Sequence, residues 1–163
     1  MSQQIGHIEF DTMGHESPQH TVGALFESPD GKTYRYVKFD DGAAVAAVAK
    51  NVCYIKAIDL ANGVYTISSD YADAGSLRNF VDGVFLSALT DGYYGFVQTY
   101  GECKGVTTDG GGDIVKGDFA IAAAANGQVD RMIAGTAPTY KVVGLALADD
   151  GLATVDLFLL LAQ

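Results

Sequence analysis

The sequence predicts an all-β fold: a single compact domain of hairpins, arranged as a β-sandwich or barrel, with an extended N-terminal arm. A chain of 163 residues is long enough for one domain with its own core. Hydrophobic residues make up 48% and charged residues only 18%, which excludes disorder for most of the chain. Twenty glycines against three prolines, together with nine tyrosines and eight phenylalanines, favour many turns between aromatic strands.

Residues 1–20 are polar and follow neither a helical nor a strand period, so we predict an extended arm there and a β-rich domain over residues 21–163. Three apolar residues are spaced along the arm: Ile5, Ile8 and Phe10. Such an arm is often simply a frayed terminus. The more specific interpretation, which we adopt as the expectation, is that these three side chains pack on a neighbouring molecule.

The first strands are predicted from turn signals and alternation. Residues 21–26 form a candidate strand, and Ser28-Pro29-Asp30-Gly31 is a strong turn sequence. In Thr33–Phe39 (TYRYVKF) polar and apolar side chains alternate between two faces, which is typical of a half-buried strand.

The next segment contains a second hairpin. Residues 43–49 are rich in alanine and lack a polar face, so a helix, a strand and a close-packed loop all remain open. Strands at 52–59 and 64–67 flank Asn62-Gly63, a dipeptide that favours hairpin turns. We expect a loop over residues 68–79.

The central strand is predicted from DGYYGFVQTYGECKGV at residues 91–106, in which an Asp-Gly turn precedes a run of aromatic and β-branched residues. Residues 80–89 fit either a helix or a strand. A second stretch decides in favour of the strand, because Gly83 and the turn at 91–92 are echoed by Gly144 and the turn at Asp150-Gly151. The echo indicates one kind of hairpin used twice.

Two more hairpins close the predicted domain. Strands at 114–125 and 128–133 flank Asn126-Gly127, and strands at 140–148 and 152–161 flank the second Asp-Gly turn. The last strand is apolar on both faces near its end, so we expect it at the centre of a sheet or at an interface. Its residues Leu157, Leu159 and Leu161 are candidates for self-association.

Charge and cysteine content limit the partners. The formal net charge of −10 argues against nucleic acid and membrane surfaces, because both are anionic. No apolar run has transmembrane length, and no signal peptide is recognised. Cys53 and Cys103 lie in apolar contexts, so we expect reduced core thiols and synthesis in a cytoplasm.

No motif in the sequence predicts a catalytic, cofactor or metal site. The glycines at 110–112 are followed by Asp113, whose charge would repel a phosphate. Asp109 and Asp113 alone offer too few carboxylates for a calcium loop. The histidines match no zinc spacing and lie far in sequence from both cysteines: His7, His15 and His20. We therefore expect a protein that is not an enzyme.

Four stretches carry a family resemblance: YRYVKF (34–39), GVFL with DGYYGFVQTYGECKGV (83–106), GDFAIAA with NGQVDRM (117–132), and VVGLALADDGLATVDLFL (142–159). Together they resemble the small decoration, or auxiliary head, proteins of tailed bacteriophages. The chain departs from that pattern at Phe96, where similar proteins often have Trp. The resemblance implies a β-rich domain that binds the major capsid protein on the outside of the virion, commonly as a homotrimer, with no cofactor and no catalytic residues.

The expected function is therefore structural, with the protein made in the host cytoplasm and placed on the capsid exterior, which it stabilises through capsid contacts and self-association. Two alternatives remain open. One is a phage tail, baseplate or receptor-binding β module. The other is a small glycan-binding or hydrolytic β protein, although the chain lacks the Trp side chains on which sugars often stack.

Overall fold

The structure, a computed structural model, describes residues 14–42, 44–72, 74, 80–133 and 141–161, and their regular structure is almost entirely β-strand. In chain order the elements are β1 (Leu25–Glu27), β2 (Thr33–Phe39), β3 (Val52–Asp59), the 3-10 turn η1 (Leu60–Asn62), β4 (Val64–Ser68), β5 (Val81–Phe85), β6 (Tyr94–Thr107), β7 (Phe119–Ala122), β8 (Val129–Arg131), β9 (Val142–Ala146) and β10 (Thr154–Leu160).

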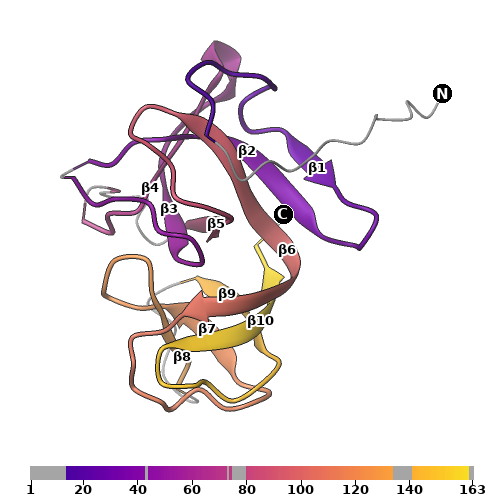
Figure 1. Ribbon diagram of the computed structural model, residues 1–163, viewed down its shortest axis with the longest axis vertical. Helices are drawn as coiled ribbons and strands as arrows, with labels where there is room; N and C mark the ends of the chain where they lie inside the picture. Colours follow the sequence, from indigo (N-terminus) through magenta and orange to yellow (C-terminus); the bar gives the residue numbers. More distant parts are fainter. Residues whose placement is uncertain (1–13, 43, 73, 75–79, 134–140, 162–163) are drawn as a thin grey trace.

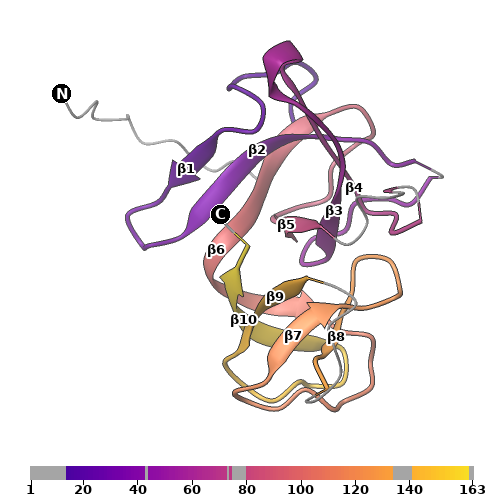
Figure 2. The same cartoon turned by 180° about the vertical axis from the view of Figure 1, so that it is seen from behind.

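The molecule has two parts that share the long strand β6, which crosses from one to the other in Figures 1 and 2. In the first part, β2, β4, β3, β5 and β6 pair in that order, and β6 pairs again with β2, which closes a five-stranded barrel. In the second part, β6 pairs with β10, and β9, β7 and β8 follow. The predicted all-β, barrel-like fold is therefore confirmed.

Strand β6 changes partners at Tyr100. This residue pairs with Thr33 of the barrel and also with Leu160 of β10. The next residue, Gly101, has φ +90°, and a Cβ there would lie 3.2 Å from the Gly31 carbonyl oxygen. Glycine permits this backbone conformation and the close approach. The prediction that this stretch is the central strand is confirmed.

The repeated hairpin is also confirmed. Strand β5 pairs antiparallel with β6, and β9 pairs antiparallel with β10. Each hairpin has a glycine where the partner backbone comes close: a Cβ on Gly83 would lie 2.8 Å from the Gln98 carbonyl oxygen, and one on Gly144 would lie 2.5 Å from that of Phe158. The two glycines that the sequence comparison aligned thus have the same steric role.

The hairpins predicted at Asn-Gly turns are present with different strand lengths. Strands β3 and β4 match the predicted ranges within one residue, and Gly63 between them has φ +68°. Strands β7 and β8 flank Gly127 but are shorter than the strands predicted around it. Residues 44–49 contain neither helix nor strand, which leaves the loop as the correct alternative for the described part of that segment.

Among the described residues the core consists of three clusters. One fills the barrel and includes Val37, Phe39, Ile67, Phe85 and Val97. A larger one joins the barrel to the second part through β3, β5, β6 and β10. A third lies on the outer face of β2 and β6 and consists of Tyr34, Tyr36 and Phe96.

Strand β2 corrects the prediction of a half-buried strand at Thr33–Phe39. Val37 and Phe39 face the barrel interior, and Tyr34 and Tyr36 belong to the outer aromatic cluster, so both faces are covered. The outer face is covered because Val22 and Phe26, which precede β2, pack against it. Alternation alone did not reveal this second layer.

Both cysteines are free and buried, as predicted. Cys53 lies in β3 and contributes to the barrel interior, whereas Cys103 lies in β6 and contributes to the larger cluster. Burial raises the pKa of both thiols, that of Cys53 well above its ordinary value. Both are therefore packing residues and poor nucleophiles.

Candidate functional site

The most distinctive surface feature is a row of apolar side chains on the outer face of the second sheet. Phe119 of β7 pairs with Leu145 of β9, which pairs with Phe158 of β10. Leu160 lies two residues further along β10 and pairs with Tyr100 of β6. Directly paired residues share a face of a sheet. We call these five residues the apolar stripe.

The apolar stripe is accessible to solvent. Phe119, Tyr100 and Leu160 expose 44%, 38% and 37% of their surface, and Leu145 and Phe158 are half-buried. The Tyr100 and Phe158 rings contact each other edge to face, with centroids 5.2 Å apart. Contiguous apolar side chains on a rigid sheet are typical of an association surface.

The leucines predicted to mediate self-association have a different place. Leu157, Leu159 and Leu161 are 0%, 0% and 2% exposed and belong to the larger core cluster. That prediction is corrected: the alternation of β10 directs these side chains inward and directs Phe158 and Leu160 outward. The expectation that the last strand lies centrally is confirmed, because β10 lies between β6 and β9.

The predicted N-terminal arm is docked on the domain in its described part. His15 and Tyr94 exchange two backbone hydrogen bonds of 2.8 Å. The Tyr36 hydroxyl accepts from the Gln19 amide at 3.1 Å and lies 3.0 Å from His15 Nδ1. Residues 14–20 of the predicted arm therefore lie against the domain. Ile5, Ile8 and Phe10 lie outside the described residues.

The described histidines take part in packing. The His20 ring contacts Phe26, Tyr36 and Phe96, with ring centroids 5.1 to 5.5 Å apart. His15 and His20 are both half-buried, so neither is a simple surface residue. His7 lies outside the described residues.

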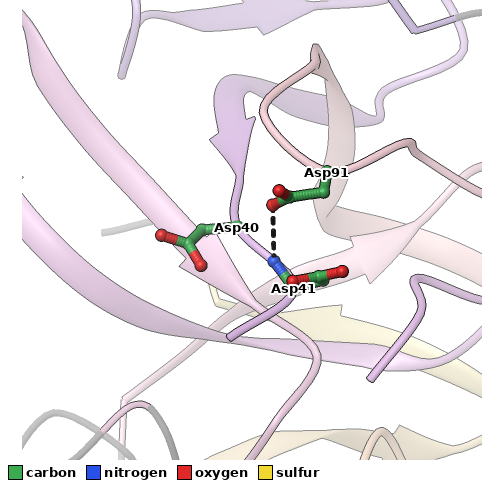
Figure 3. A group of neighbouring side chains, drawn as sticks. All are labelled: Asp40, Asp41 and Asp91. Atoms are coloured by element: carbon green, nitrogen blue, oxygen red, sulfur yellow. Dashed lines mark hydrogen bonds between the residues drawn. The ribbon is translucent and has the colours of Figure 1, made fainter. Parts of the chain in front are cut away.

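One acidic group consists of Asp40, Asp41 and Asp91, drawn in Figure 3. The Asp91 carboxylate points at the backbone amide of Asp41 and accepts a hydrogen bond of 3.0 Å from it. Asp40 Oδ1 accepts from the Gly42 amide and from the Lys56 ammonium, 2.9 and 2.8 Å away. These bonds hold two turns together, and we assign the group no metal.

A second acidic group joins Asp130 of β8 to Asp109 and Asp113, the two loop residues weighed as calcium ligands. Burial raises the pKa of the Asp130 carboxyl, and the charges of Asp109 and Asp113 raise it further. Asp109 Oδ1 accepts from the Gly111 amide at 3.1 Å, as turn aspartates often do. Exposed acidic groups are common without an ion, and we retain the interpretation as a loop.

One ion pair lies inside the barrel. Arg35 Nε is 3.2 Å from Asp82 Oδ1, the Tyr65 hydroxyl donates to the same oxygen at 2.6 Å, and Asp82 Oδ2 is buried without a partner among the described residues. Burial raises the pKa of Asp82, and the Arg35 charge opposes this effect. This pair could not be predicted, because a single Asp within an apolar strand indicates nothing about its partner.

Comparison of the chain with protein-family models, with curated proteins and with solved structures gave no match. No helix in the described part of the chain is long and apolar enough to cross a membrane.

Proposed function

We propose that this protein is a non-enzymatic structural protein that binds the outer surface of a bacteriophage capsid and stabilises it through capsid contacts and self-association. The apolar stripe is the main observation that supports this proposal. A sheet that leaves five apolar residues in a row on its outer face loses hydrophobic stabilisation unless another surface covers them.

The scaffold suits an attachment role. Strand β6 belongs to both parts of the molecule, and one core cluster extends across them. A load applied to one part is therefore transmitted through continuous sheet and packed side chains. The formal charge of −10 favours a protein or solvent environment over anionic lipid and nucleic acid. These features support the proposal together with the sequence resemblance to capsid decoration proteins.

The experiment is cosedimentation of purified protein with assembled, expanded shells of a tailed bacteriophage. We expect the wild type to pellet with the shells and to form a homotrimer at micromolar concentration. Two lysines placed in the stripe by Phe119→Lys and Leu160→Lys should weaken shell binding by at least tenfold, on the order of 1.4 kcal/mol. The cause is the burial of unpaired charge at the interface.

Ile58→Lys with Leu60→Lys is the matched control. Ile58 and Leu60 are 49% and 63% exposed and lie in the β3–β4 hairpin, at the opposite end of the molecule from β7 (Figure 1), so this double substitution adds the same two charges away from the stripe. Shell binding should be unchanged. A wild type that stays monomeric and remains in the supernatant would contradict the proposal, and attachment to tails or to a glycan array would favour the two alternative functions.

A further inference from the structure

A polar pocket of about 400 Å³ lies beside β6 where the barrel meets the second sheet. Its lining comes from three separate segments: Lys32 precedes β2, Lys50 precedes β3, and the remaining residues belong to β6, namely Gln98, Glu102, Cys103 and Lys104. Pockets at junctions between packed units are common ligand sites, and this volume is at the small end of their range.

The charge of the pocket is opposite to that of the protein. The chain has 20 acidic and 10 basic residues, yet three lysines and a single glutamate line this pocket. Lys104 lies 3.7 Å from Glu102, and Lys32 pairs with Asp30 at 2.8 Å. No carboxylate of the described residues is paired with the Lys50 ammonium. Lys50 is thus the one lysine of this pocket without a carboxylate partner among the described residues, and an anion beside it would be attracted by its charge.

The backbone of Lys50 is held in an unfavourable conformation. Its φ is +73°, a value that residues other than glycine rarely adopt. Two backbone hydrogen bonds fix it there, from the Lys50 amide to the Phe85 carbonyl at 2.9 Å and from the Thr107 amide to the Lys50 carbonyl at 3.1 Å. Glycine would fit with less strain, so Lys50 adopts this conformation at a cost in free energy.

The ammonium groups of Lys50 and Lys32 both influence the pKa of the buried Cys103 thiol. Burial raises the pKa of Cys103, and the positive charges of Lys50 and Lys32 oppose that rise. Gln98 lines the side of the pocket formed by β6. Its side-chain amide donates to the carbonyls of Tyr100 and Glu102 at 3.1 and 2.9 Å, and these bonds hold the bend of β6. The pocket thus has a hydrogen-bonded wall on its β6 side and a lining in which lysines outnumber the single glutamate.

We propose that this pocket binds a small oxyanion, either a free phosphate or a carboxylate group of a second copy of this chain. Lys50 and Lys104 would neutralise its charge and donate hydrogen bonds to its oxygens. The pocket belongs to the single chain, and testing it requires no capsid.

The test is an amide NMR titration of the full chain in which inorganic phosphate replaces chloride at constant ionic strength. We expect saturable shifts at Lys32, Lys50 and Lys104, and a loss of affinity of at least tenfold in Lys50→Gln. Lys104→Gln is the second variant, in case the first does not fold. Lys116→Gln changes an exposed lysine outside the pocket and should bind phosphate as the wild type does.

Sedimentation of the same variants distinguishes the two sources of the anion. If Lys50→Gln also weakens self-association and phosphate competes with it, the bound group is a carboxylate of a second copy. If self-association is unchanged while phosphate binding is lost, the ligand is the free anion. Shifts that follow salt concentration alone, or equal phosphate affinity in the wild type and both pocket variants, would overturn the proposal.

Discussion

Arg35 and Asp82 form an ion pair in the barrel interior, where burial disfavours the ionised carboxylate more strongly than the guanidinium favours it. The pKa of Asp82 in the folded protein is therefore raised above 3.8. A carboxyl group with a raised pKa binds its proton more tightly in the folded than in the unfolded state. Its contribution to stability is complete below pH 3.8 and is lost as the pH rises through the folded-state pKa.

Replacing Arg35 with methionine should raise the pKa of Asp82 further, because the Arg35 charge is the largest of the influences that lower it. The loss of stability with rising pH should then be larger. We expect the free energy of unfolding to fall by about 3 kcal/mol at pH 8, the usual cost of leaving a buried charge unpaired. The loss should shrink as the pH is lowered towards 5, since Asp82 can then take up a proton. Urea unfolding at several pH values measures both quantities.

The double variant Arg35→Met with Asp82→Leu is the control. It removes both charges, so most of the lost stability should return and the added pH dependence should disappear. A loss in Arg35→Met that is the same at pH 5 and pH 8 would show that Asp82 does not titrate as described.

The two cysteines give a second prediction at this scale. Because both side chains are buried and their pKa values are raised, neither thiol should react with a disulfide reagent at pH 8 in the native protein. Both should react once the chain is unfolded in guanidinium chloride. A thiol that reacts rapidly in the native protein would contradict the burial of that cysteine.

Among the structural elements, we expect the segment at residues 14–20 to stabilise the fold. It supplies the His15 pairing to β6 and the two contacts to the Tyr36 hydroxyl. We expect a chain lacking residues 1–20 to unfold at a lower temperature than one lacking residues 1–13. Tyr36→Phe should cost about 1 kcal/mol, because the Gln19 amide loses its acceptor. Tyr93→Phe, which removes the exposed bond to Glu16, should cost less.

Equal unfolding temperatures for the two truncated chains would mean that the contacts of residues 14–20 with the sheet do not stabilise the protein. Calorimetry of both chains, together with limited proteolysis of Tyr36→Phe, provides the measurement.

The glycines of the repeated hairpin predict a contrast between two alanine substitutions. Gly144→Ala places a methyl group against the Phe158 carbonyl oxygen and should destabilise the protein by about 2 kcal/mol. Gly151→Ala in the turn of the same hairpin has 3.9 Å to its nearest atom and should change stability by less than about 0.5 kcal/mol. Urea unfolding of the two variants decides the point, and equal stabilities would show that β9 and β10 are not in this register.

The elements could be predicted where local signals set them. Asn62-Gly63 and Asp91-Gly92 marked turns, and the echo between Gly83 and Gly144 identified two hairpins of the same type. The order of strands in the sheet could not be predicted, because the parallel pairing of β2 with β4 and the second pairing of β2 with β6 depend on contacts distant in sequence. For the same reason the inward direction of Leu157 and the outward direction of Phe158 were not assigned.

At the scale of the whole molecule, the association surface arises from pairing across strands. Phe119, Leu145 and Phe158 come from three strands, and no short motif contains them together. The basic pocket has the same origin, since Lys32, Lys50 and Lys104 meet only after the barrel closes. Both sites were absent from the sequence-based prediction because the register that assembles them is a property of the folded sheet.

Antibody labelling of intact phage particles, viewed by electron microscopy, tests whether this β scaffold attaches to the outside of a capsid. We expect label distributed over the outer face of the heads, and loss of that label from particles carrying Phe119→Lys with Leu160→Lys. Label confined to tails, or particles that carry none of the protein, would contradict it.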